Sequence, residues 1–154
     1  MGIIKGRVTA RRNDNFVLFL IGMRINNFWK IHKWLPIFFQ MPKMIKELES
    51  DKSLGYLNGE AWFGRNIIFV QYWKSFNHLE KFARSKDYSH FPAWQKFLKK
   101  VGPSGDVGIW HETYEIKNGS YENIYANMPP FLLGKISPLH KIDTTNNSAR
   151  KRKK

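Results

Sequence analysis

The hydrophobic pattern of this chain alternates between stretches that suit a strand and stretches that suit a helix. Residues 15–25 read NFVLFLIGMRI, so apolar side chains fall on both faces of an extended strand. Residues 34–50 instead repeat apolar positions at three- and four-residue steps, which predicts a helix. The same two patterns predict strands at 15–25, 57–63, 67–74, 107–116 and 120–126, and helices at 34–50, 77–85 and 91–101.

Turn and breaker residues set the expected limits of these elements. Pro36 is expected in the first turn of its helix, where the missing N–H is harmless, and Pro42 is expected to kink or break that helix. Asn118-Gly119 predicts a tight turn that returns the chain as a further strand. We therefore expect one domain over residues 1–134, followed by a basic, disordered tail at 135–154.

The order strand, helix, strand, strand, helix, strand, strand predicts an α+β ferredoxin-like sandwich, an antiparallel sheet with its helices on one face. In such a sheet the face away from the helices usually alternates polar residues. Residues 16–23 and 67–70 do not alternate, so an apolar partner must cover the second face. A second copy of the sheet is the simplest cover, which predicts a homodimer that closes as a dimeric α/β barrel.

Composition removes several classes of site and partner. The chain has no cysteine, which excludes disulfides, zinc thiolates and a cysteine nucleophile, and favours a cytoplasmic location. The net charge is +14, but five of the positive charges lie in residues 150–154. The remaining lysines are spread along the predicted helices, which argues against a nucleic-acid partner.

Residues 26–46 mix aromatic side chains with lysines, a composition that also occurs at membrane surfaces. The interpretation we favour is a helix whose apolar stripe lies in the core and whose lysines are solvated. Peripheral membrane contact stays as an alternative.

Two histidines are candidates for general acid–base catalysis. His90 lies one helical turn before Trp94 and is expected on the inward face of its helix; the alternative is a helix-entry residue that bonds a carbonyl. His111 alternates with Trp110 along one strand, so the two side chains point to opposite faces. The pattern does not decide which face lies under the helices.

Aromatic and polar side chains near these histidines are expected to bind a flat or apolar substrate. Tyr72 and Trp73 end one strand on opposite faces, and one of them is expected in the core. The complete set of expected substrate-binding residues is Tyr72, Trp73, Trp94, Trp110, Tyr114 and Asn127. Tyr114 and Asn127 are the expected donors to an enolate-like oxyanion. Phosphate loops, HExxH and GxSxG are absent from the sequence, so no metal site is expected outside the haem alternative given below.

Several blocks of the sequence resemble a known group of proteins. Trp73-Lys74-Ser75, Ser89-His90 and Trp94 resemble the antibiotic-biosynthesis-monooxygenase superfamily of dimeric α/β barrels. Residues 19–26, 32–36, 108–114 and 125–130 resemble one branch of it more closely. That branch is grouped with a monooxygenase of fungal fumagillin biosynthesis, and some members are labelled phenylacetaldoxime dehydratase family.

The resemblance implies a homodimer with a pocket between sheet and helices in each subunit. It implies a monooxygenase-like enzyme that acts on an apolar or aromatic molecule without a cofactor, by forming a carbanion that reduces O₂. The alternative that it implies is a haem protein, haem-degrading or aldoxime-dehydratase-like, with His90 as the axial ligand. Pro92 and the basic helix that follows it depart from the haem-degrading pattern. A non-catalytic module that binds a small molecule, a membrane surface or nucleic acid is the alternative from another class.

Overall fold

The computed structural model describes residues 2–88, 95, 97, 99 and 102–153. Its strands are β1 (Ile4–Ala10), β2 (Phe16–Ile25), β3 (Tyr56–Trp62), β4 (Asn66–Trp73), β5 (Val107–Ile116), β6 (Tyr125–Met128) and β7 (Leu139–Lys141). Its α-helices are α1 (Ile31–Ser50), α2 (Phe76–Arg84) and α4 (Ala149–Arg152), and short 3-10 turns occur at Lys52–Leu54, Gly102–Ser104 and Leu132–Lys135.

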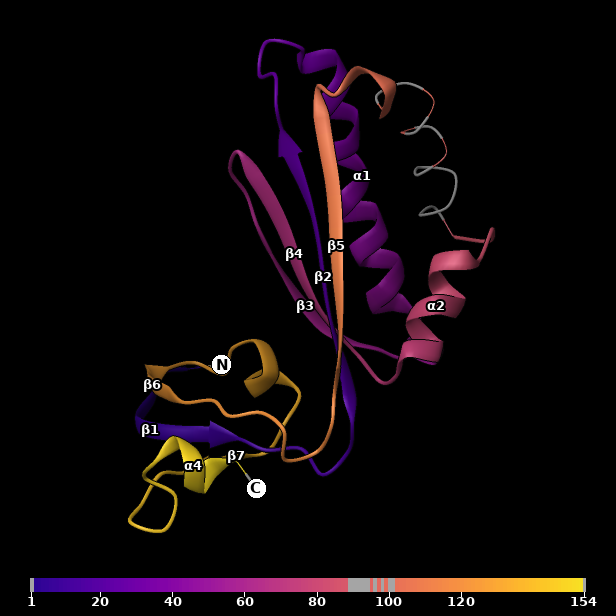
Figure 1. The fold of residues 1–154 in the computed structure, drawn as a ribbon. Coiled ribbons are helices and arrows are strands. Elements are labelled where there is room, and N and C mark those ends of the chain that lie inside the picture. The colour runs from indigo at the N-terminus through magenta and orange to yellow at the C-terminus, as the bar shows by residue number, and fades with distance from the viewer. Residues whose placement is uncertain (1, 89–94, 96, 98, 100–101, 154) are drawn as a thin grey trace.

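The larger sheet has the order β3-β4-β2-β5, and all its neighbours are antiparallel. Helices α1 and α2 lie on the same side of this sheet (Figure 1). This is the ferredoxin-like arrangement that the sequence predicts, with the first and third strands of the motif at the centre. Four of the five predicted strands are found here within two residues of their expected limits.

Odd-numbered residues of β2, β4 and β5 face the helices. Val17, Phe69 and Trp73 belong to one buried cluster with Leu48 of α1 and Leu79 of α2. A second cluster joins odd-numbered strand residues to the first half of α1; its buried members are Met23, Ile25, Ile67, Phe97 and Val107. Both clusters form because the odd positions of neighbouring strands stand opposite each other in the register.

Helix α1 begins three residues earlier than predicted, and this changes the role of its prolines. Pro36 falls inside the helix instead of in its first turn, and Pro42 lies inside it as well. The helix continues through both prolines from Ile31 to Ser50, so of the kink or break expected at Pro42 the break does not occur. The packing of its apolar stripe on the sheet outweighs the backbone hydrogen bonds that each proline removes.

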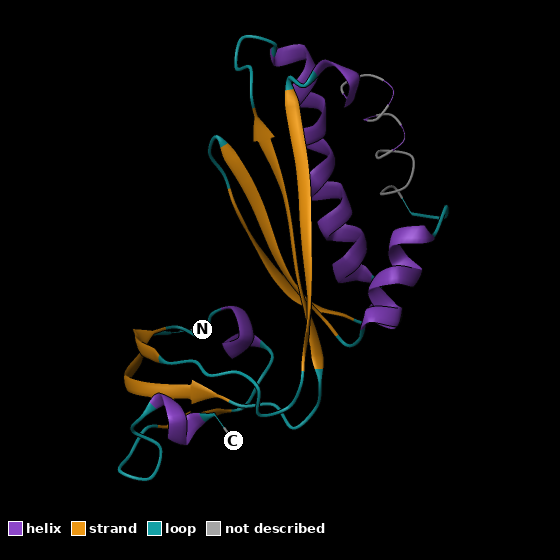
Figure 2. Cartoon of the chain, in the orientation of Figure 1, coloured by secondary structure: helices purple, strands orange, loops and turns teal. Residues whose placement is uncertain are grey.

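A second sheet with the order β6-β1-β7 lies beyond one end of the larger sheet (Figure 1). The sequence predicts a strand at 120–126 paired with residues 107–116. Instead, β6 starts at Tyr125 and pairs with β1. A turn does form at Asn118-Gly119, but loops then lead the chain away to the second sheet (Figure 2). Strand β1 was not predicted, because Lys5 and Arg7 interrupt its apolar pattern.

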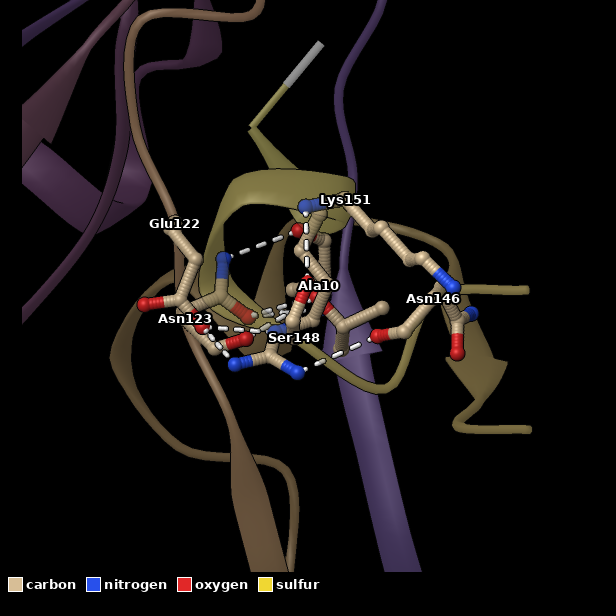
Figure 3. A network of polar contacts seen from close by, with 8 residues as sticks. Ala10, Glu122, Asn123, Asn146, Ser148 and Lys151 are labelled. Carbon is tan, nitrogen blue, oxygen red and sulfur yellow. Dashed lines mark hydrogen bonds and ion pairs between the residues drawn. The ribbon is translucent and has the colours of Figure 1, made fainter. Parts of the chain in front are cut away.

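The C-terminal segment differs from the disordered tail that the sequence predicts. Strand β7 pairs with β1, and α4 packs nearby through polar contacts (Figure 3). Arg152 donates from Nε to Glu122 Oε1 at 2.6 Å and from Nη1 to the Asn146 carbonyl at 3.1 Å. Within the segment, Asn146 accepts from the Asp143 amide at 2.8 Å and donates to the Lys141 carbonyl at 3.1 Å. Composition shows only that the segment is polar. Its order comes from these specific hydrogen bonds, which composition does not predict.

The second sheet and the turn at 132–135 cover part of the far face of the larger sheet. Tyr72 packs there with Phe16 and Leu133 in a third buried cluster. Lys135 Nζ lies 2.7 Å from Glu60 Oε2 of β3. Further along the same face, Leu20, Ile68 and Trp110 are half-buried. The chain therefore covers with its own residues one part of the face that the sequence assigned to a partner.

Gly22 gives a direct test of the packing on this face. A Cβ atom at Gly22 would lie 2.5 Å from Trp110 Nε1 and 2.8 Å from the Ile67 carbonyl oxygen. We expect Gly22→Ala to lower the free energy of unfolding by about 1–3 kcal/mol, because the indole and the backbone must both move. Gly64→Ala is the matched control, since its Cβ would meet no atom closer than 3.9 Å. Urea denaturation measures both changes; equal small losses in the two variants would contradict the packing described.

Candidate functional site

A cavity of about 570 Å³ lies between the larger sheet and its helices. This volume suits a small-molecule ligand. Strands β2, β4 and β5 supply one wall through Phe19, Ile21, Met23, Phe69, Gln71, Trp73 and Ile109. Helix α1 supplies the facing wall through His32, Lys33, Pro36, Ile37, Gln40, Met41, Met44 and Leu48. Leu79, Phe82 and Ala83 of α2 and Phe97 complete the described lining, which is mainly apolar.

Trp73 is the most buried aromatic residue of this lining, with none of its side chain exposed. The ring of Tyr56 stands edge-on to the Trp73 indole, with ring centres 5.6 Å apart. The ring of Phe82, on α2, has its centre 5.5 Å from that of the indole. Helix α2 is placed against this strand end by its cap, in which Ser75 accepts a hydrogen bond from the His78 amide. The sequence prediction that Trp73 and Tyr72 point to opposite faces is confirmed.

Gln71 is the buried polar residue of the cavity wall. Its side chain is 6% exposed, and its Oε1 accepts a hydrogen bond of 2.9 Å from Trp73 Nε1. The sequence analysis did not select it. The sequence does contain a signal for it: Gln71 is an amide on the same strand face as Phe69 and Trp73, and the other residues on that face are apolar.

The lining becomes charged at the start of α1. Lys33 Nζ lies 2.5 Å from Asp106 Oδ2, and Lys30 Nζ lies 3.0 Å from Asp106 Oδ1. Hydrogen bonds from Lys33 and Lys30 hold the pKa of Asp106 well below its ordinary value. This ion-paired group ties the start of α1 to the segment before β5, at the end of the cavity where His32 is exposed.

His111 lies on the helix side of β5, which answers the question that the sequence left open. Its ring is 5.7 Å from the ring of Phe19, and Phe19 lines the cavity. His111 itself is exposed and is not part of the described lining. The imidazole therefore stands one aromatic ring away from the cavity.

Tyr72 and Trp110 lie on the far face of the sheet. Tyr72 is buried against Phe16, with ring centres 5.9 Å apart, and burial raises the pKa of its phenol to about 12. Trp110 lies over Gly22 of the neighbouring strand. The sheet separates both side chains from the cavity.

Tyr114 and Asn127 also lie away from the cavity. Tyr114 is exposed on the far face and donates to Glu112 Oε2 at 2.6 Å, a bond that raises the pKa of its phenol. Asn127 belongs to β6 of the second sheet, where its Oδ1 accepts from the Gly6 amide at 2.8 Å. His90 and Trp94 lie outside the described residues, so their expected place at the cavity stays a prediction.

In the part of the chain that the structure describes, no three side chains of the metal-binding types come together in a way that would hold an ion. Nor does any described helix have the length and apolar character needed to cross a bilayer.

Comparison with known proteins gives relatives in sequence and in fold. Monooxygenase af470 of Aspergillus fumigatus strain Af293 is 27% identical over an alignment of 156 residues. The alignment covers 86% of this chain and 54% of that protein. An aldoxime dehydratase crystallised with butyraldoxime superimposes with a TM-score of 0.65 and 17% identity, covering 88% of this chain and 42% of that one.

A second aldoxime dehydratase structure gives a TM-score of 0.67 at 17% identity, covering 89% of this chain and 44% of that one. At this identity the two structures establish the fold alone. The chain thus spans about half the length of its curated relative and less than half of either dehydratase. Residues 16–133 build the larger sheet, both cavity walls and the approach to the second sheet. The sequence profile of the Monooxygenase af470-like family matches this segment, and the chain belongs to that family.

Proposed function

We propose that this protein is a monooxygenase-like enzyme whose substrate is an apolar or aromatic small molecule bound in the cavity between sheet and helices. The observation that carries the proposal is a ligand-sized, mainly apolar cavity within the family-matched segment. Membership of a monooxygenase-like family supports the reaction type. The substrate follows from the lining, which offers apolar contact and few polar groups.

The proposed reaction needs no external reductant. A base removes a proton from an activated CH₂ carbon, and the resulting carbanion transfers electrons to O₂. One oxygen atom then enters the substrate as a carbonyl and the other leaves as water, so that CH₂ and O₂ yield C=O and H₂O. The apolar walls would exclude water from the carbanion.

We propose His111 and His90 as the candidate bases, since a neutral imidazole is suited to proton removal near neutral pH. The position of His111 beside Phe19 supports it, because a modest movement of that ring would bring the imidazole to the cavity. His90 rests on the sequence resemblance alone.

Haem chemistry remains the alternative from the same fold. His32 is the one imidazole within the described lining, and it is exposed at the end of the cavity. The described walls therefore do not provide a buried axial ligand, and no reaction step is assigned to haem. Absorbance spectroscopy after haem addition distinguishes the alternatives: a Soret band that is lost on His90→Ala would favour the haem protein.

The enzyme proposal is tested without knowing the substrate. Purified protein is incubated with an apolar extract of its source cells under isotopically heavy dioxygen, and mass spectrometry measures label in apolar products. We expect labelled products with the wild type and loss of them with Met44→Trp, because the indole fills the cavity. Lys43→Trp is the matched control, since Lys43 is exposed beside it on α1.

His111→Ala should slow product formation about a hundredfold or more if His111 is the base. Unchanged product formation after replacement of both His111 and His90 would overturn the proposed bases. Absence of labelled products with the wild type, or their persistence in Met44→Trp, would overturn the cavity as the site of reaction.

We further propose that two copies associate through the far faces of their larger sheets. The half-buried apolar side chains of Leu20, Ile68 and Trp110 support this, because they form a continuous apolar stretch beside the part that the second sheet covers.

Sedimentation velocity tests the dimer. We expect a dimer at micromolar concentration and a monomer for Ile68→Lys, because a buried unpaired charge at the interface costs several kcal/mol. Lys43→Glu, on the exposed side of α1, should leave the dimer intact. A stable wild-type monomer, or an Ile68→Lys variant that folds and remains dimeric, would contradict this interface.

Attachment to an anionic membrane surface is a second function that a specific observation favours. Five large apolar side chains are exposed before and within the first half of α1 and in the β3–β4 hairpin; they are called here the aromatic patch and are Phe28, Trp29, Ile31, Phe39 and Phe63. Trp29 is 93% exposed and Phe39 is 66% exposed. Phe38 contacts the rings of both Phe39 and Phe63, and the Arg65 guanidinium lies 5.7 Å from the centre of the Phe28 ring.

The charge around the aromatic patch matches such a surface. Residues 15–46 contain no aspartate or glutamate but five lysines and arginines, two of which, Lys30 and Lys33, are paired with Asp106. Exposed Trp and Phe side chains beside cations are the combination that binds at the headgroup level of anionic lipids.

Sedimentation with vesicles of phosphatidylcholine and phosphatidylglycerol tests the membrane function. We expect binding that weakens as salt is added, because exposed charges are screened, and binding that is at least tenfold weaker for Trp29→Ser with Phe39→Ser. Ile124→Ser is the matched control, since it removes an exposed apolar side chain that lies outside the patch. Equal binding of all variants, or none by the wild type, would contradict it.

A further inference from the structure

Gln71 places a hydrogen-bond donor on an apolar wall. The indole N–H of Trp73 can only donate, so the Gln71 side-chain oxygen must face it, as the 2.9 Å bond shows. The two N–H groups on Gln71 Nε2 are thereby directed away from the indole. The hydrogen bonds among the described residues give Nε2 no acceptor, although the side chain is 94% buried.

A donor that faces a mainly apolar cavity gains a hydrogen bond from an acceptor that enters the cavity. Gln71 lines the cavity together with Phe69 and Trp73, so a molecule in the cavity is able to reach it. Trp73 in turn is held by Tyr56 and Phe82, which fixes the amide oxygen and leaves the donor in one orientation. The donor is thus placed before any ligand binds.

The chemistry of the wall narrows the ligand. The charged group of the described lining is Lys33, which is already paired with Asp106 at the end of the cavity near His32. An anion placed beside Gln71 would lose its hydration without gaining an opposite charge, which is unfavourable. A neutral oxygen or nitrogen acceptor loses less on transfer and gains the amide bond.

We propose that Gln71 is a specificity-determining residue, which donates a hydrogen bond to a neutral acceptor atom, such as a carbonyl oxygen, of an otherwise apolar ligand in the cavity. This inference rests on the proposed function for the cavity as the substrate site. For the proposed reaction, the same donor would orient a carbonyl next to the carbon that loses its proton.

The test uses two probes of nearly the same shape, methyl naphthyl ketone and ethylnaphthalene, with binding measured by equilibrium dialysis. The quantity measured is the ratio of the two dissociation constants. We expect Gln71→Met to raise the dissociation constant of the ketone about tenfold relative to that of the hydrocarbon, with little change in hydrocarbon binding. Lys43→Met, a matched control outside the described lining, should leave the ratio within about twofold, since Lys43 is exposed on α1.

Gln71→Met leaves the Trp73 N–H without its acceptor and is at risk of folding poorly. Gln71→Met with Trp73→Phe removes both members of the pair and is the second variant, because it leaves no buried indole N–H without an acceptor. The same loss of ketone preference is expected from it.

The outcomes separate this inference from the proposed function. If both probes bind the wild type, Met44→Trp abolishes both, and the ratio is unchanged in the Gln71 variants, the inference is overturned and the cavity stands. If neither probe binds the wild type, or Met44→Trp leaves binding intact, the cavity itself is not the ligand site and both proposals are overturned.

Discussion

The structure depends on a sheet whose central strand is apolar on both faces. Strand β2 buries Val17 and Met23 toward the helices and Phe16 toward the second sheet. Exposure of either apolar face to water is unfavourable, so other apolar residues must pack on each face. Helices α1 and α2 cover one face, and the second sheet with the turn at 132–135 covers part of the other. The cavity and the remaining apolar surface both follow from this requirement.

The helix face and the far face serve different purposes. On the helix face the described side chains leave space between α1 and the strands, and Gln71 supplies a directed polar group there. On the far face the aromatic side chains pack closely: Trp110 lies over Gly22, and Tyr72 is buried with Phe16. Aromatic residues adjacent in the sequence are thus divided between the cavity and a packed surface by the two-residue period of the strand.

The resemblance recognised in the sequence is confirmed at the level of the family, and the ferredoxin-like fold is confirmed by the strand order. The resemblance does not assign the binding residues. Trp73 lines the cavity, whereas Tyr114 and Asn127 contact Glu112 and Gly6 in other parts of the molecule. Their positions follow from which way each strand is turned and which sheet it joins, and neither is encoded in residue type.

Local periodicity in the sequence determined the four strands and the helices of the larger sheet, because each of those elements carries its own apolar repeat. Only the tertiary structure decided that odd-numbered residues face the helices, that His111 and not Trp110 shares that side, and that Gln71 meets Trp73. It also decided that residues 139–141 pair with β1, through contacts that join segments more than 120 residues apart. Pairing over such distances depends on the register and hydrogen bonds of the folded chain, which no local pattern specifies.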